Sequence, residues 1–372
     1  MDKIIVYYPY KLRKLLSGSA VRPVKMIEAF KTLALEYNLE LIEIHGNSLE
    51  RSRKLKNLYQ NISPKQIRYC YIENSTIPMW LTDDDHIPRK PTLEIKFLQY
   101  LKNNKIPVGI FYRDAYWKFN DLYTIKPGIK QIMQLLFKME LYIFKKYGSV
   151  FYLPSVYMNE YVKFPKSNVI PLPPGGNDFI DSNGYKKQID KPNAVYVGGI
   201  HPRYGVYEML KAIENINKDQ IELNLLMVCR KKELEKYKKL LVPYLDKEWL
   251  TIFHAYGEEL IPIYRKAHFG IVPIKRDVYN DFAVAVKMFE YLSYGLPIVA
   301  TDCKAQKDLV EENNFGIIVK SEPESMAKGI KKMLERENLD FYRNEAISAF
   351  RDRHLWFHRA LTVHNSLLSS KY

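Results

Sequence analysis

The chain has 372 residues, of which 47% are hydrophobic and 27% charged, so a mainly disordered protein is excluded and two domains are expected. Lys and Arg (57) outnumber Asp and Glu (42), and the formal net charge of +15 predicts an anionic partner. Three widely separated cysteines exclude a disulfide framework and a zinc-ligand spacing.

Neither a secretory signal nor a membrane-spanning segment is expected from the sequence. The N-terminal stretch MDKIIVYYPY has too short an apolar run for a signal peptide, and no stretch reaches the roughly 18 apolar residues that cross a bilayer. We therefore expect a cytoplasmic protein.

Strands and helices alternate through the first half of the chain. Residues 3–10 (KIIVYYPY) predict a buried strand, and residues 21–37 have apolar positions at helical spacing. Residues 39–46, 106–114 and 149–155 are further short, mostly apolar runs that predict strands. This alternation is typical of a parallel α/β sheet.

A turn rich in proline and glycine (PPGG) separates this half from a second alternating series. We place a first domain at 1–170, a hinge at 171–178, and a second domain at 179–350. Residues 351–372 are expected to form a C-terminal helix that could return to the first domain. The second domain should begin with a strand and a glycine turn at 193–200 and a helix at Val206–Ile216.

The stretch AVAVKMFEYLSYGLPIVATD, residues 283–302, predicts a helix followed by a strand. At about 100° per residue, Met288, Tyr291 and Leu292 share one face, while Lys287 and Glu290 lie along its flank. Two interpretations are open. The pair could be an exposed i,i+3 ion pair, or Lys287 could contact phosphate and Glu290 a ribose diol at the carboxyl edge of the sheet.

Four segments in this order resemble those of the two-domain GT-B glycosyltransferases of the group 1, or GT4-like, family. They are YVGGIHPRYGVYEMLKAI, AYGEELIPIYRKAHFGIVPI, KMFEYLSYGLPIVATD and LVEENNFGIIV. The resemblance implies an α/β protein with two Rossmann-like doubly wound domains facing each other across a cleft. It implies that the first domain binds an acceptor and that the second binds a nucleotide sugar without a metal. It also assigns the diphosphate to Lys287 and the ribose to Glu290.

The sequence departs from the family pattern at the donor site. Phe282 stands where the family has a carboxylate that contacts the sugar, and either Asp281 or Asp277 could replace it. Gly199 and Tyr204 stand where the family has Arg and Lys. We keep Gly199 as a nucleotide-sugar-binding residue of the glycine turn.

A second phosphate-binding cation is expected from one of two arginines. Arg203 lies next to the position of the family's lysine, and Arg230 follows a predicted strand. A planar guanidinium can grip a phosphate with two hydrogen bonds.

In the first domain the candidates are Gly18, Arg113 and Asp114. Gly18, in the loop LSGSA, would let backbone amides approach phosphate or the transferred sugar, although SGS is also a common flexible loop. Arg113 and Asp114 stand where the family has a catalytic-site histidine. They are candidate catalytic residues together with Lys287, or they neutralise each other at a strand end.

Two charged segments outside these motifs have ordinary explanations. The acidic loop LTDDDHIP (81–88) contains an Asp-x-Asp pair, but we expect a solvated loop and no metal. The segment 128–148 places Lys130, Lys138 and Lys145 opposite an apolar face of Ile132, Leu136, Met139 and Ile143. We expect that apolar face to lie in the domain core, and the alternative is a helix on an anionic membrane.

These observations predict a glycosyltransferase that moves a hexose from a nucleotide diphosphate sugar to a glycan or glycolipid hydroxyl in bacterial-type surface polysaccharide synthesis. The resemblance implies retention of configuration, and a UDP-sugar is favoured over a GDP-sugar. The expected partners are the donor, a glycan or lipid-linked acceptor and the inner face of the plasma membrane, with no nucleic acid and no cofactor. The alternatives are a nucleotide-sugar epimerase of the same fold and a catalytically inactive partner subunit.

Overall fold

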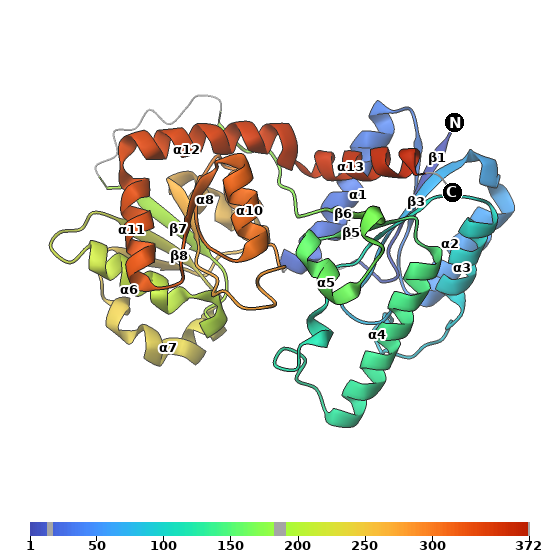
Figure 1. Ribbon diagram of the computed structural model, residues 1–372, viewed down its shortest axis with the longest axis horizontal. Coiled ribbons are helices and arrows are strands. Elements are labelled where there is room, and N and C mark those ends of the chain that lie inside the picture. Colours follow the sequence, from blue (N-terminus) through green and yellow to red (C-terminus); the bar gives the residue numbers. More distant parts are fainter. Residues whose placement is uncertain (13–17, 182–190, 371–372) are drawn as a thin grey trace. The chain divides into compact units, whose positions relative to one another are not determined.

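The computed structural model describes residues 1–12, 18–181 and 191–370, and the chain divides into two compact units (Figure 1). Unit 1 consists of Met1–Pro173 together with Trp356–Tyr372, and unit 2 is Pro174–Leu355. The chain thus passes between the units twice. The first passage falls in the proline- and glycine-rich segment 171–178, where neither a helix nor a strand can continue.

Within the described residues, the sheet of unit 1 has six parallel strands in the order β2-β1-β3-β4-β5-β6. They are β1 (Lys3–Tyr7), β2 (Glu40–Ile44), β3 (Ile67–Glu73), β4 (Val108–Phe111), β5 (Val150–Leu153) and β6 (Val169–Pro171). Ile4, Ile5 and Val6 are all buried, so both faces of β1 are covered, as in a parallel sheet with helices on either side. β2 lies on one side of β1 and β3 lies on the other. The direction in which strands are added therefore reverses at β1, which borders the topological switch point.

The helices of unit 1 are α1 (Gly18–Glu36), α2 (Ser48–Asn61), α3 (Leu93–Asn103), α4 (Pro127–Tyr147), α5 (Asn159–Val162) and α13 (Trp356–Ser369). Short 3₁₀ turns lie at Pro64–Gln66, Met79–Leu81, Tyr116–Lys118, Val156–Met158 and Lys166–Asn168. Asn47 and Glu50 form a capping box at the start of α2. Pro127 opens α4, a position where a missing N–H costs nothing.

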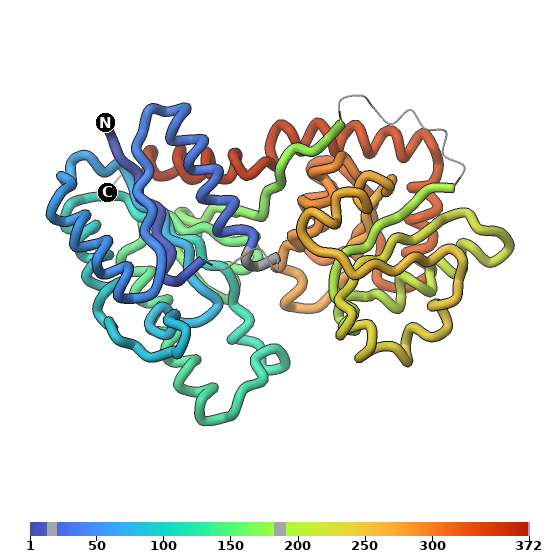
Figure 2. Tube along the Cα trace, turned by 180° about the vertical axis from the view of Figure 1, so that it is seen from behind, coloured from blue at the N-terminus to red at the C-terminus, as the bar shows by residue number. Residues whose placement is uncertain are grey.

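The last helix of the chain, α13, lies beside the first helix, α1 (Figures 1 and 2). Its residues Ala360, Val363 and Leu367 are buried in the core of unit 1. The hydroxyl of Tyr69 on β3 is 3.0 Å from Nδ1 of His364. These contacts make the C-terminal segment part of unit 1, although about 180 residues of unit 2 precede it in the chain.

Within the described residues, unit 2 has a sheet of six parallel strands in the order β12-β11-β10-β7-β8-β9. They are β7 (Asn193–Val197), β8 (Asn224–Val228), β9 (Leu250–Phe253), β10 (Phe269–Val272), β11 (Ile298–Thr301) and β12 (Gly316–Val319). β7 and β10 are neighbours at the centre, where the order of the strands reverses. In open parallel sheets this reversal leaves a crevice at the carboxyl ends of the strands.

The helices of unit 2 are α6 (Val206–Ile216), α7 (Lys231–Leu245), α8 (Ile261–Lys266), α9 (Val286–Leu292), α10 (Lys304–Asn313), α11 (Pro323–Leu334) and α12 (Arg336–Ala349). Pro202–Tyr204 and Gly257–Leu260 are 3₁₀ turns, and Phe350–His354 is π-helical. The expected helix at Val206–Ile216 is found with these bounds. The helix expected at 351–372 is instead a π-helical turn, a break at Leu355 and α13.

Across the described parts of the chain, no helix is both long enough and apolar enough to pass through a lipid bilayer.

Candidate functional site

The turn that follows β7 is built from two glycines whose neighbours leave no room for a side chain. A Cβ atom at Gly198 would lie 2.5 Å from Nζ of Lys287, and one at Gly199 would lie 2.7 Å from Oε2 of Glu233. The Tyr196 hydroxyl donates to the Gly199 carbonyl at 2.6 Å, and the Ile200 N–H donates to Glu233 at 2.9 Å. The turn is therefore held in place while its backbone stays open to close approach.

Lys287 is the second residue of α9 and projects toward this turn. Its Nζ lies 4.2 Å from the ring centroid of Tyr196 and 5.9 Å from that of Tyr204. Among the described residues, no carboxylate lies within 4.0 Å of this ammonium group. Burial lowers the pKa of Lys287 to about 8, and the charge of Glu290 opposes the shift. A partly buried cation that lies against aromatic faces, with no carboxylate in direct contact, is a favourable site for an anion.

Glu290 lies one turn further along α9. The hydroxyl of Tyr264, on α8, donates to its Oε2 at 3.1 Å, and the Tyr264 ring stacks on Tyr294 at 4.8 Å. Burial raises the pKa of Glu290, while the hydrogen bond from Tyr264 and the charge of Lys287 oppose this shift. The carboxylate keeps acceptor capacity beyond the single bond from Tyr264.

The buried face of α9 holds these two side chains in position. Met288, Tyr291 and Leu292 are buried, as the helical spacing predicts. The Val197 N–H, at the end of β7, donates to the Tyr291 hydroxyl at 2.9 Å. This bond ties α9 to the strand that carries the glycine turn. Lys287 and Glu290, both in the described part of the chain, do not form an ion pair within 4.0 Å, so the interpretation as an exposed i,i+3 ion pair does not apply.

The two candidate arginines differ in their surroundings. Arg203 pairs with Asp277 through Nη2 at 2.6 Å, and its guanidinium lies 5.6 Å from the Tyr279 ring centroid. Arg230 is exposed, and its nearest carboxylate oxygen belongs to Glu233, at 3.7 Å. Because Glu233 also accepts from Ile200, it links Arg230 to the glycine turn.

The two candidate carboxylates take part in the loop between β10 and α9. Asp281 accepts from Arg276 Nε at 3.0 Å and from the Lys304 N–H, at the start of α10, at 3.1 Å. Asp277 pairs with Arg203 and accepts from the Asn280 N–H at 2.8 Å. Both carboxylates therefore organise the loop, and Phe282 between them and α9 is buried.

In unit 1 the carboxyl ends of β3 and β4 bring charged groups together. Arg113 donates to the Tyr10 hydroxyl at 2.9 Å and pairs with Glu73, and its backbone N–H donates to Asn74 Oδ1 at 2.7 Å. Arg22 lies 3.3 Å from the other oxygen of Glu73. The buried carboxylate of Glu73 thus holds two arginines at the end of the sheet.

Asp114 and Gly18 have simpler local settings. Asp114 accepts from the Tyr116 N–H at 3.0 Å, an Asx turn that starts the 3₁₀ turn at Tyr116–Lys118. Gly18 is the first residue of α1. The segment 13–17, which precedes it in the expected glycine loop, lies outside the described residues.

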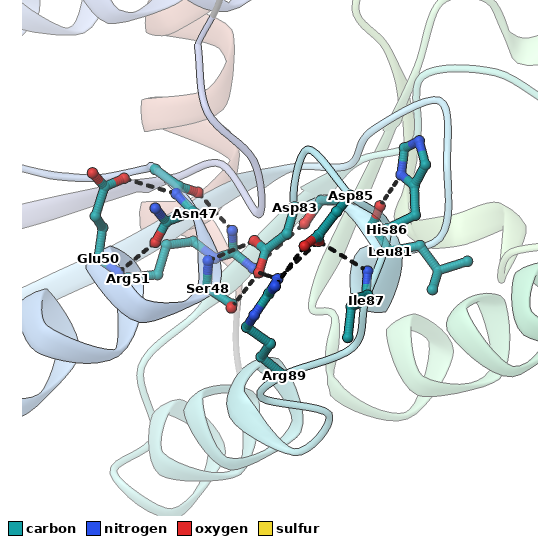
Figure 3. Close-up of polar contacts among 12 residues, drawn as sticks. Asn47, Ser48, Glu50, Arg51, Leu81, Asp83, Asp85, His86, Ile87 and Arg89 are labelled. Carbon is teal, nitrogen blue, oxygen red and sulfur yellow. Dashed lines mark hydrogen bonds and ion pairs between the residues drawn. The ribbon is translucent and has the colours of Figure 1, made fainter.

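The acidic loop of unit 1 is bound to neighbouring protein groups (Figure 3). Asp83 accepts from the Ser48 N–H at 2.7 Å and from its hydroxyl at 2.5 Å, which satisfies donors at the start of α2. Asp85 accepts from Arg89 at 2.8 Å. In the part of the chain that the structure describes, no three His, Cys, Asp or Glu side chains are grouped as metal ligands.

Gly199, Lys287 and Arg230 thus lie around one turn, and Glu290 follows on the same helix as Lys287. Sequence reasoning missed Gly198, Tyr196, Glu233 and Tyr264 in unit 2 and Glu73 in unit 1. Glu73 carried a signal, because a charged residue ends an apolar strand there. Tyr196 carried no such signal. Strands of a parallel sheet that is covered on both faces are largely apolar, so a tyrosine in one of them looks like an ordinary core residue.

The fold is that of the GT-B class. HepE (Alr3699) of Anabaena, solved with UDP, superposes with a TM-score of 0.65 over 99% of this chain and 100% of its own, at 11% identity. A glycosyltransferase from Rickettsia africae gives 0.64 over the whole of both chains at 13% identity. An α,α-trehalose 6-phosphate synthase from Burkholderia multivorans gives 0.62 over 99% of this chain and 97% of its own, at 11% identity.

By sequence, residues 191–336 match the family described as "Glycosyl transferases group 1", and this segment contains the whole glycine turn and α9. None of the curated protein sequences matches the chain. The chain thus has the expected GT-B fold, and the resemblance to group 1 glycosyltransferases is confirmed.

Proposed function

We propose that this protein is a glycosyltransferase that takes a hexose from a UDP-sugar bound by unit 2. The observation that carries the proposal is the ammonium of Lys287, set against the Tyr196 ring beside the glycine turn and without a close carboxylate among the described residues. All of these residues belong to the segment matched to group 1 glycosyltransferases.

The donor would be held at three points. Lys287 and one of the two arginines would face the diphosphate, the turn at Gly198 and Gly199 would let its oxygens approach the backbone, and Glu290 would accept from the ribose. Arg230 suits the phosphate role better than Arg203, because Arg203 already pairs with Asp277 at 2.6 Å. A UDP-sugar is supported by the fold's relatives, since HepE is solved with UDP and with UDP-glucose.

The chemistry assigned to these residues is electrostatic. As the glycosidic bond breaks, negative charge develops on the leaving diphosphate, and cations already in place stabilise it without reorganising. This is the reason we propose a metal-independent, GT4-like reaction. Retention of configuration follows from the family resemblance.

Unit 1 would bind the acceptor. Its candidate residues are Arg113, which Glu73 and Tyr10 position, and Asp114, which could orient the incoming hydroxyl. We propose a glycan or lipid-linked glycan of bacterial-type surface polysaccharide synthesis as the acceptor. The enzyme would then work in the cytoplasm, at the inner face of the plasma membrane.

A thermal-shift comparison of UDP, GDP and their sugars tests the donor. We expect UDP-sugars to raise the melting temperature most, and Lys287→Met to abolish the shift. Lys211→Met is the matched control, because Lys211 is an exposed lysine on α6 of the same unit. A panel in which no nucleotide stabilises the protein would favour a catalytically inactive subunit.

Product analysis tests the reaction. With a UDP-sugar and a glycan acceptor, a transferase releases UDP and forms a new glycoside. An isomeric sugar formed without any acceptor would instead identify an epimerase.

A further inference from the structure

The helix α4 of unit 1 has an exposed apolar stripe along its length. Its members share one side of the helix at intervals of three or four residues, and each is at least 46% exposed. They are Ile129, Ile132, Leu135, Met139 and Tyr142. At 1.5 Å per residue the stripe extends for about 20 Å. The N-terminal half of α4 projects from the rest of unit 1 (Figures 1 and 2).

A different face of α4 already supplies the core. Phe137, Leu141 and Phe144 are buried, and the Trp117 and Phe137 rings stack at 4.9 Å. The expectation that Ile132 and Met139 would face the core is therefore wrong, whereas Ile143 is buried as expected. The helix is apolar on two sides, and periodicity cannot tell which of them packs on the sheet.

Lysines border this stripe. Lys138, Lys145 and Lys146 are exposed on α4 itself. Burial and the charges of Lys145, Lys138 and Lys163 lower the pKa of Lys118, so each of these three ammonium groups lies close enough to Lys118 to repel it.

No negative charge on the surface of α4 balances these lysines. Glu140 is the single acidic residue of the sequence from Pro127 to Tyr147, and it is fully buried. The exposed surface of α4 therefore carries apolar, cationic and neutral polar side chains and no acidic one.

We infer that α4 docks on an anionic lipid bilayer, with the stripe of Ile129, Ile132, Leu135, Met139 and Tyr142 in the interface and the lysines at the headgroups. A bilayer is apolar below a negative surface, so it complements both parts of this face at once. Tyr142 suits the boundary because its ring is apolar and its hydroxyl is polar. A protein partner would need its own apolar groove and a matching acidic rim.

This inference depends on the proposed function only for the lipid-linked acceptor that the membrane would supply. The surface belongs to unit 1, and nucleotide binding is assigned to unit 2. Nucleotide binding can therefore be measured if membrane docking fails, and membrane docking can be measured if nucleotide binding fails.

Co-sedimentation of the full chain with vesicles tests the inference. We expect binding to vesicles of phosphatidylglycerol and phosphatidylcholine, little binding to phosphatidylcholine alone, and a loss of binding at high salt. The double variant Ile132→Ser/Leu135→Ser should weaken partitioning by about tenfold or more, because two apolar side chains no longer enter the interface.

Control variants separate this surface from general effects. Leu35→Ser changes an exposed leucine on α1 of the same unit, and Lys65→Gln/Lys96→Gln removes two exposed lysines that do not belong to α4. Both should bind vesicles as the wild type does, whereas Lys138→Gln/Lys145→Gln should bind more weakly. Each variant's melting temperature and UDP shift show that it is folded.

Three outcomes would overturn the inference. They are wild-type protein that stays in the supernatant with anionic vesicles, equal losses in the stripe and control variants, and a stripe that instead mediates self-association in sedimentation without lipid.

Discussion

The ammonium group of Lys287 lies 4.2 Å from the centroid of the Tyr196 ring, and the turn at Gly198 lies directly beside it. The ring face stabilises the cation weakly, and the cation stays half-buried without a close carboxylate among the described residues. A bound diphosphate would supply the missing negative charge. The first two predictions follow from this arrangement.

The affinity for UDP should fall as the pH rises above about 8. Burial lowers the pKa of Lys287 to about 8, and only the protonated ammonium attracts the diphosphate. Calorimetry from about pH 7 to about pH 10 measures this. Lys287→Arg should bind with little change over the same range, because a guanidinium stays charged. A wild-type affinity that is constant across this range would contradict the role of Lys287.

Gly198→Ala should weaken UDP binding by about tenfold, because the new methyl group would displace the Lys287 ammonium from beside the turn. The added Cβ would lie 2.5 Å from Nζ of Lys287 and 3.0 Å from the Tyr196 hydroxyl. Gly128→Ala is the matched control, since a Cβ there meets nothing within 4 Å. Isothermal titration calorimetry measures the UDP affinity of both variants. Equal affinities of Gly198→Ala and Gly128→Ala would show that UDP does not bind close to the turn at Gly198.

Glu290→Ala should lower UDP affinity by about a hundredfold, since hydrogen bonds to a charged acceptor contribute about 1.5–3 kcal/mol. Tyr264→Phe removes one donor at 3.1 Å and leaves the carboxylate, so a smaller loss is expected. The difference between the affinities for UDP and for uracil, measured by calorimetry, gives the combined contribution of the ribose and the diphosphate. If Glu290→Ala binds UDP as the wild type does, the ribose assignment is wrong.

Stability should decrease as the pH rises from about 4.5 to about 8 because of Glu140. Burial raises the pKa of this carboxyl from 4.5 to about 8, opposed by the Met79 N–H and the Asn74 amide and reinforced by Glu94. In this window the unfolded chain releases a proton that the folded protein keeps, so each pH unit costs up to about 1.4 kcal/mol.

Urea unfolding at several pH values, with Glu140→Gln beside the wild type, isolates this contribution. The amide cannot ionise, so the variant should lose this part of the slope between about pH 4.5 and about pH 8. Glu28→Gln, an exposed residue of α1, should keep the wild-type slope. Identical slopes in the wild type and Glu140→Gln would show that Glu140 is ionised in the folded protein.

Much of the fold could be predicted because its signals are local. The apolar runs at Lys3–Tyr7 and Phe269–Val272 and the helical spacing at Val206–Ile216 predict elements that the structure contains. The site was partly predictable for the same reason. Lys287 and Glu290 stand at a spacing that puts both on the flank of α9, and Gly199 stands in a turn between a strand and a helix.

The partners of the other candidates could not be predicted, because they come from distant parts of the chain. Arg203 meets Asp277 across 74 residues, and Arg113 meets Glu73 across 40. The Asp281 carboxylate accepts hydrogen bonds from Arg276 and from the first N–H of α10. Which of several nearby charges pair depends on how the loops fold over the sheet ends.

The sequence by itself determined two parallel α/β units and the Lys287–Glu290 motif, because both rest on periodicities of a few residues. Only the tertiary structure decided that Lys287 lies against Tyr196 and that the apolar stripe of α4 faces outward. It also decided that α13 joins unit 1. These facts depend on which surfaces are covered by segments far away in the chain, and spacing along one segment carries no information about what covers it.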